Sequence, residues 1–257
     1  MEKINLKIPI VYEDSNIIVI NKPALLVVNK SATVEGITLQ DWLKEKDWLK
    51  KDEAKAEKGY QRFLTDSGMV HRLDKEASGL MVAAKTPEAF FGLLEQFKER
   101  KVKKSYLVLA HGKVAVEEKT IKGRIGRKQN DRRKHGIVSY GVTAETWLEP
   151  VSYWQDPKEK NRSKKYFTLV RVRPQTGRTH QIRVHLLSIR HPLVSDRLYA
   201  GKKTSRADHR WCPRLFLHAE SLEFIHPVTK KIVKFFSPLP SDLSTALAKR
   251  QKIEITN

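Results

Sequence analysis

Short apolar runs recur along the chain and predict a fold that is rich in β-strands. Residues 8–14 and 16–23 are rich in β-branched side chains and are separated by a turn at residues 14–16. This pattern indicates two paired strands. Residues 79–85 form a continuous apolar run, which is typical of a strand buried on both faces. Two further strands are expected at residues 103–114 and 164–174. A hairpin is expected at residues 215–236, with its turn at 226–229.

Helical signals are fewer than strand signals. Thr38 is a plausible N-cap for a helix over residues 38–51, and Thr86 followed by Pro87 starts a second helix. The second helix is expected to bury one stripe, made of Phe90, Phe91, Leu93, Leu94 and Phe97.

Two later helices are also expected. One begins near Thr179 and ends before Pro192, and the other begins near Ser241. The first of them is predicted to keep its apolar residues on one face, namely Ile182, Leu186 and Ile189. The charged segment 52–63 is expected to be a loop or a frayed helix.

The order of these elements predicts the fold class. Strands outnumber helices and do not alternate regularly with them, so we expect an α+β fold with a mixed, largely antiparallel sheet. No linker rich in Gly, Pro or Ser divides the chain, and we therefore predict one domain over residues 1–257.

Charge narrows the choice of partner. The chain has 50 Lys and Arg against 29 Asp and Glu, a net charge of +21, which favours a polyanionic partner such as nucleic acid or an anionic membrane. A membrane surface would require a basic amphipathic helix, and the basic runs lack apolar interleaving, so nucleic acid is preferred. Cys212 is the single cysteine, which excludes an intrachain disulfide and is typical of a cytoplasmic protein.

Two basic segments, 122–135 and 158–165, are expected to be loops. Each is either a solvated charge run or a phosphate-binding surface, and the positive charge of the whole chain favours the second interpretation. A turn before the helix near Thr179 could also hold an anion. The predicted RNA contacts from these regions are Arg124, Arg127, Lys128, Arg132, Arg133, Arg178, Thr179 and His180.

Three side chains are candidates for chemistry, and each has a structural alternative. Asp74, just before the buried strand, is either a turn carboxylate neutralised by Arg72 or a reactive carboxylate. Tyr106 is either core or a face on which a base stacks, and Arg183 is either a surface residue or a buried partner of a distant carboxylate.

No metal or cofactor is expected. His180 and His185 would lie ~140° apart around a helix, which is poor geometry for metal ligation. The chain has no nucleotide-binding glycine loop, zinc-protease motif or nucleophile elbow. A nuclease would need paired carboxylates or a His pair, and neither is well placed.

Together, five segments resemble the RluA family of pseudouridine synthases, in order and spacing, over most of the chain. They are EDSNIIVINKPALLVV (13–28), HRLDKEASGLMVAAKT (71–86), KSYLVLAHG (104–112), GRTHQIRVHLLSIRHPLVSDRLYAG (177–201) and LFLHAESLEFIHP (215–227). The resemblance implies a bent mixed sheet flanked by helices, with a central basic cleft. It also implies isomerisation of uridine to pseudouridine in RNA, such as rRNA or tRNA, without metal or organic cofactor.

Site roles follow from the same resemblance. Asp74 matches the catalytic aspartate, Tyr106 the tyrosine that stacks on the target base, Arg183 the basic residue that pairs with the aspartate, and Arg72 the arginine that helps displace the base. Attack of Asp74 at C1′ of the ribose and attack at C6 of the uracil both stay open. We expect a cytoplasmic monomer without an N-terminal S4 RNA-binding domain. The rival interpretation is a non-catalytic RNA-binding module or RNA chaperone on the same scaffold.

The chain departs from the family pattern at three positions. Ala77 stands where Thr is usual, Ser195 where Gly is usual, and Asn29 where His is usual. The first departure raises a question about the geometry of the Asp74 loop, and the second about the turn before Asp196. His71 is expected to have a hydrogen-bonding structural role rather than acid–base work.

Overall fold

The structure is a computed structural model that describes residues 6–50, 58–115, 120–161 and 165–254. Its residues group into two compact units, each described here by itself. Unit 1 comprises Met1–Lys103 and Ser221–Ser237, and unit 2 comprises Lys104–Glu220 and Pro238–Asn257. The expectation of one domain stays a prediction. Among the described residues, no helix is long and apolar enough to cross a membrane.

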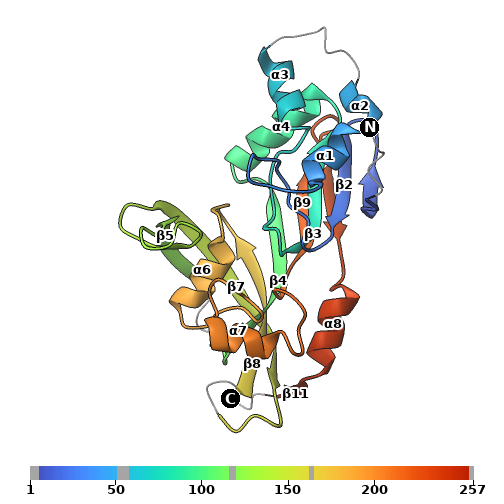
Figure 1. Ribbon diagram of the computed structural model, residues 1–257. Coiled ribbons are helices and arrows are strands. Elements are labelled where there is room, and N and C mark those ends of the chain that lie inside the picture. The colour runs from blue at the N-terminus through green and yellow to red at the C-terminus, as the bar shows by residue number, and fades with distance from the viewer. Residues whose placement is uncertain (1–5, 51–57, 116–119, 162–164, 255–257) are drawn as a thin grey trace. The chain divides into compact units, whose positions relative to one another are not determined.

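Unit 1 holds an antiparallel set of strands with helices beside it (Figure 1). Strand β1 pairs with β2, β2 pairs with β3, and β9 pairs with β10, all antiparallel. The strands are β1 (Ile10–Glu13), β2 (Ile17–Lys22), β3 (Ser78–Ala84), β9 (Leu217–Ile225) and β10 (Ile232–Phe236). The helices are α1 (Leu39–Lys44), α2 (Asp47–Lys50), α3 (Lys58–Thr65) and α4 (Pro87–Lys98).

Local sequence signals explain most of unit 1. Every residue of β3 is buried, as its apolar run predicts. Thr86 caps α4 by accepting the N–H of Ala89, and Pro87 occupies the first turn. Two predictions are wrong: Phe91, expected in the core stripe, is 40% exposed, and the helix expected over 38–51 is divided into α1 and α2.

Segment 52–63 is only partly described. Residues 52–57 lie outside the described residues, and residues 58–63 are helical in α3 rather than loop. The helix predicted over 38–51 is divided because α1 ends at its C-cap, Glu45.

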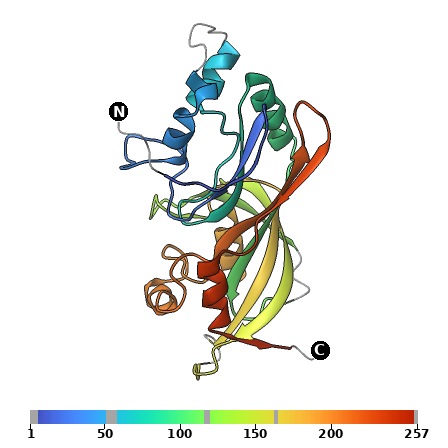
Figure 2. The same ribbon diagram turned by 90° about the vertical axis from the view of Figure 1, so that its right-hand side faces the viewer.

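Unit 2 is built on a second antiparallel set of strands. The order of its strands is β4-β8-β7-β5-β6, and β11 runs along the end of the long strand β7 (Figure 2). The strands are β4 (Lys103–His111), β5 (Thr120–Arg127), β6 (His135–Ile137), β7 (Val142–Gln155), β8 (Tyr166–Pro174) and β11 (Gln251–Ile253). The helices are α6 (Gln181–Ser188), α7 (Lys202–Asp208) and α8 (Ser241–Ala248).

Several predictions for unit 2 are corrected. The basic segment 122–135, expected to be a loop, contributes to strands β5 and β6, which pair with each other and hold β5 against β7. Helix α6 begins two residues later than expected, and its first six residues are all buried rather than apolar on one face. Residues 158–161 are outside helices and strands, as expected, and residues 162–164 lie outside the described residues.

One face of the unit 2 sheet carries Tyr106. Tyr106 in β4 is paired with Val172 in β8, which is paired with Leu148 in β7, and directly paired residues project from the same face. Thr146, two residues before Leu148, projects from this face as well and accepts a hydrogen bond from Gln181 of α6 at 2.9 Å. Helix α6 therefore covers the face that carries Tyr106.

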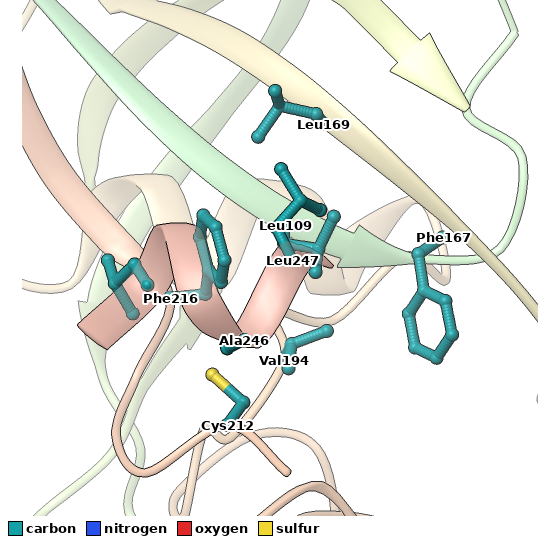
Figure 3. Close-up of a cluster of buried hydrophobic side chains, with 9 residues drawn as sticks. Leu109, Phe167, Leu169, Val194, Cys212, Phe216, Ala246 and Leu247 are labelled. Atoms are coloured by element: carbon teal, nitrogen blue, oxygen red, sulfur yellow. The ribbon is translucent and has the colours of Figure 1, made fainter. Parts of the chain in front are cut away.

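The other face of the same sheet carries a cluster of buried hydrophobic side chains. Because side chains alternate along a strand, Leu109 of β4 and its partner Leu169 of β8 project away from the face of Tyr106. Figure 3 shows them with Ala246 and Leu247 of α8. The cluster consists of Leu109, Phe167, Leu169, Val194, Cys212, Phe216, Leu243, Ala246 and Leu247. The mixed α+β class with largely antiparallel pairing is thus confirmed.

Candidate active site

The segment before Asp74 is attached to strand β3 by backbone hydrogen bonds. The N–H of Ala84 donates to the carbonyl of Gly68 at 2.8 Å, and Met69 forms an isolated antiparallel bridge with Ala83. Gly68 has φ of +72°, and a Cβ at this position would lie 2.1 Å from the Ala84 carbonyl oxygen. The close approach of the two segments therefore requires glycine at residue 68.

His71 continues this attachment. Its Nε2 accepts the N–H of Val82 at 3.0 Å, and its ring stacks on Phe97 of α4 with the centroids 4.7 Å apart. Because Nε2 is an acceptor, this nitrogen carries no proton in that arrangement. The expected structural role of His71 is confirmed.

Asp74 itself lies at the start of a tight turn and is half-buried. The N–H of Ala77 donates to the Asp74 carbonyl at 3.1 Å, which closes the turn just before β3 begins. The fully buried ammonium of Lys22 donates to the carbonyls of Pro23 and Leu26, and to that of Lys75 at 3.3 Å. The carboxylate thus projects from a turn that is fixed on both sides.

Arg72 does not neutralise Asp74. Its side chain is exposed and makes no ion pair or side-chain hydrogen bond within the part of the chain that the structure describes. This finding removes the interpretation of Asp74 as a turn carboxylate compensated by its neighbour. It also leaves the Arg72 guanidinium available for another group.

Ala77, where Thr is usual in the family, does not disturb the turn. Ala77 is 1% exposed, and the hydrogen bond that closes the turn comes from its backbone. A backbone donor is the same for Ala and Thr, so this departure leaves the turn around Asp74 closed.

Arg183 in unit 2 is held by a buried carboxylate. Its Nε and Nη2 donate to the two carboxylate oxygens of Asp196 at 2.7 and 2.8 Å, and the two side chains are 2% and 0% exposed. Such a bidentate pair fixes the plane of the guanidinium. One face of that plane lies over the ring of Tyr199, 5.0 Å from its centroid. The interpretation of Arg183 as a surface residue is wrong, and its expected pairing with Asp74 stays a prediction.

The turn that presents Asp196 holds Ser195 by hydrogen bonds. Ser195 has φ of +59°, the left-handed region that favours glycine, which is the usual residue of the family here. Its hydroxyl donates to the Cys212 carbonyl at 2.7 Å, and its N–H donates to Asp208 at 3.0 Å. Asp196 also accepts the N–H groups of Leu198 and Tyr199. Hydrogen bonds of the serine therefore offset the strain of its backbone.

Tyr106 is half-buried, and it shares its sheet face with α6, the helix that carries Arg183. Tyr106 and the helix that carries Arg183 therefore lie on the same face of the unit 2 sheet. On the other face, the Ser105 hydroxyl and the Arg171 Nε both donate to Glu220, at 2.7 and 2.6 Å. This network, in which Ser105 and Glu220 are buried and Arg171 is half-buried, anchors β4 next to Tyr106.

The predicted RNA contacts are mostly exposed. Arg124, Arg127, Lys128, Arg132 and Arg133 lie on or between β5 and β6 with exposed side chains. Arg133 is neutralised in part by Asp131, to which it donates at 3.0 and 3.1 Å. In contrast, Arg127, Lys128 and Arg132 have no ion-pair partner among the described residues.

The turn before α6 differs from the expected anion site in one respect. His180 is the N-cap of α6, has φ of +56°, and is half-buried with its Nδ1 2.8 Å from the Tyr199 hydroxyl. Arg178 and Thr179 are exposed. His180 therefore has a structural contact, and the exposed Arg178 has a weaker one, because its Nε donates to the Thr143 carbonyl at 3.4 Å.

Known proteins are similar to this chain in sequence and in fold. A family model described as RNA pseudouridylate synthase matches residues 16–188. The chain belongs to the RNA pseudouridylate synthase family. It is therefore an isomerase that converts uridine in RNA to pseudouridine, and the RluA resemblance is confirmed.

Two curated relatives carry the name ribosomal large subunit pseudouridine synthase D. The relative from Buchnera aphidicola is 37% identical over 95% of this chain and 74% of its own length. The relative from Pseudomonas aeruginosa is 39% identical over 93% of this chain and 70% of its own length. The solved structure of human RNA pseudouridylate synthase domain containing 1 is 28% identical, with a TM-score of 0.69, and the match covers 98% of this chain and 91% of that one.

Two residues that support the candidate site were absent from the sequence-based list. Asp196 fixes Arg183, and Lys22 fixes the turn after Asp74. A buried Arg needs a carboxylate partner, which is a signal that a partner exists but does not identify it. Lys22 lies near the end of the predicted strand 16–23, and a lysine there gives no signal of its burial.

Proposed function

We propose that this pseudouridine synthase acts on ribosomal large-subunit RNA, with Asp74 as its catalytic carboxylate. The observation that carries the assignment of Asp74 is its placement on a turn attached to β3, with Arg72 exposed and not paired to it. Rigid elements hold reactive groups more accurately than mobile loops do. The names of the relatives support the choice of RNA.

The proposed reaction requires few side chains of the protein. A uridine stacked in RNA must be flipped out, which costs a few kcal/mol. Stacking on Tyr106 would offset ~1–3 kcal/mol of that cost, and Arg72 would occupy the place that the base leaves. Asp74 then acts at C1′ or C6, and the C1′–N1 bond breaks. The uracil rotates, C5 bonds to C1′, and any bond formed by Asp74 breaks again. The proton that leaves C5 is balanced by the one that N1 gains.

Arg183 has an electrostatic role in this proposal. Paired with Asp74, it would keep the carboxylate ionised, which a nucleophile or base requires. Its bidentate bond to Asp196 supports the proposal because it leaves the guanidinium with one fixed orientation.

Asp74→Asn tests the catalytic assignment. The variant should form pseudouridine at less than about a thousandth of the wild-type rate, because the amide is neither a nucleophile nor a base. RNA binding, measured by filter retention, should stay within about threefold, because affinity comes from phosphate contacts. Substantial activity in Asp74→Asn would overturn the assignment. Absence of pseudouridine with wild-type protein on RNA from its own source would favour the RNA-binding module.

Pseudouridine mapping in a deletion strain tests the choice of RNA. We expect one or more pseudouridines of large-subunit rRNA to disappear and tRNA to be unchanged. A loss confined to tRNA would contradict the ribosomal assignment and leave the catalytic one standing. The single cysteine and the ribosomal relatives also support a cytoplasmic enzyme.

A further inference from the structure

Unit 2 has a cavity of about 380 Å³ where α8 meets the segment that follows α7. Arg210 and Trp211 line it from that segment, and Thr245, Ala246 and Lys249 line it from α8 and its C-cap. The volume is in the range of small-ligand pockets. None of these residues belongs to the candidate site described above.

The walls of the cavity are fixed by the cluster in Figure 3. Ala246, which lines the cavity, is buried in that cluster, and Trp211 packs against it. The guanidinium of Arg250 lies 3.8 Å from the centroid of the Trp211 ring, and Phe167 meets that ring edge-on at 5.4 Å. The cavity is therefore formed before any ligand arrives, and binding would require little ordering.

The cavity carries uncompensated positive charge. Arg210 and Lys249 are exposed, and neither side chain has an ion pair or hydrogen bond among the described residues. Asp242 is the carboxylate in the lining, and Arg214 neutralises it with hydrogen bonds of 2.6 and 3.1 Å. Two cations thus face solvent beside an aromatic ring.

The remaining polar groups of the lining are mostly donors. His209 is neutral as arranged, because its Nδ1 lies 2.7 Å from the Ser205 carbonyl and must donate, while its Nε2 accepts from Arg197 at 3.1 Å. The Trp211 indole N–H and the Thr245 hydroxyl have no hydrogen-bond partner among the described residues. This combination matches an anion that also has a flat surface and acceptor atoms.

We propose that this cavity binds one nucleotide of the RNA substrate, other than the uridine being isomerised. Arg210 and Lys249 would contact its phosphate, and the ribose or base would lie beside Trp211, whose indole N–H could donate to it. The proposal rests on the proposed function, because it takes RNA as the substrate.

The position of the cavity on the sheet sharpens the proposal. Ala246 and Trp211 belong to the face of Leu109 and Leu169, which is opposite to the face of Tyr106. An RNA that places its target base on Tyr106 and a second nucleotide in the cavity must therefore extend around an edge of the unit 2 sheet. Short RNAs could occupy only one of the two faces.

Salt-dependent RNA binding tests the proposal. The double variant Arg210→Gln, Lys249→Gln removes both charges, and Lys202→Gln, Lys203→Gln is the matched control on exposed α7. With full-length protein and a large-subunit rRNA transcript, the slope of log K against log salt should become less steep by about 0.7–0.9 for the cavity variant, because one phosphate contact is lost. The control should change the slope by less than about 0.5, and thermal unfolding should show both variants folded.

Crosslinking gives an independent readout. RNA that contains 4-thiouridine should crosslink to the peptide that holds Trp211 in the wild-type protein, and tenfold less in the cavity variant. An equal change of slope in the cavity and control variants, or no crosslink to that peptide, would overturn the proposal. Both readouts measure binding, so they stand even if wild-type protein forms no pseudouridine, which would overturn only the proposed function.

Discussion

The turn that carries Asp74 and the helix that carries Arg183 are held in place by different kinds of interaction. Around Asp74 the bonds come mainly from the backbone: Ala84 to Gly68, Ala77 to Asp74, and Lys22 to carbonyls. Around Arg183 they come from buried side chains, above all Asp196. The first arrangement depends on how closely two backbones approach, and the second depends on which side chains are present.

Asp196→Ala should have the largest effect on stability. Removal of one partner leaves the Arg183 guanidinium buried without its counter-charge, which costs about 3–5 kcal/mol in free energy of unfolding. Urea denaturation measures this loss. Asp131→Ala, which removes the partner of the exposed Arg133, should leave the free energy of unfolding nearly unchanged, because solvent and salt screen an exposed ion pair. Similar losses in the two variants would mean that burial of the Arg183 pair is unimportant.

Gly68→Ala probes the backbone arrangement of unit 1. The added Cβ would meet the Ala84 carbonyl oxygen at 2.1 Å, so the segment must separate from β3 at a cost of about 2–4 kcal/mol. Gly36→Ala is the matched control, because Gly36 has φ of +79° with no atom within 4 Å of the added Cβ. It should cost only about 1–2 kcal/mol. Pseudouridine formation should fall in Gly68→Ala and be retained in Gly36→Ala.

The element boundaries show what sequence can predict. Strand β3 and helix α4 carry their signals locally, in an apolar run and in Thr86–Pro87, and both are as expected. In strand β5 the buried Ile121 and Ile125 stand among Gly and basic residues, which weaken the strand signal, and pairing with β7 makes the segment a strand. The predicted loop was wrong for that reason. Similarly, the sequence leaves Arg183 open between a surface residue and a buried partner of a distant carboxylate, and only the fold brings Asp196 to it.

Lowering the pH should destabilise the helix that carries Arg183 before it affects the turn that carries Asp74. Burial lowers the pKa of His185 in α6 from 6.5 to about 4, and its Nε2 is buried without a hydrogen-bond partner among the described residues. Since the folded pKa is below the unfolded value, the stabilisation is present above pH 6.5 and is lost as the pH falls towards 4. The slope should approach about 1.4 kcal/mol per pH unit. His185→Gln should flatten the stability curve over this range, and an unchanged curve would contradict the assignment to His185.

Ser195→Gly should have the smallest effect. Glycine relieves the left-handed backbone at residue 195, which stabilises the turn by about 1 kcal/mol, but it loses the hydroxyl bond to Cys212, which is worth about 0.5–1.5 kcal/mol. The two changes should cancel to within about 1 kcal/mol in urea denaturation, with activity retained. A loss above about 2 kcal/mol in the free energy of unfolding would show that the Ser195 hydroxyl stabilises the turn by more than it offsets the backbone strain.

The division of unit 1 along the chain has a consequence for its synthesis. Its last strands arrive with Ser221–Ser237, after the 117 residues of Lys104–Glu220 have been made. Asn21 donates to the Ser237 hydroxyl across 216 residues, and Gln96 exchanges two hydrogen bonds with the backbone of Ile225. At ribosomal speed the delay is on the order of ten seconds. Because β9 pairs with β3, the edge of β3 beside the nascent Asp74 segment stays uncovered until nearly the whole polypeptide has been translated.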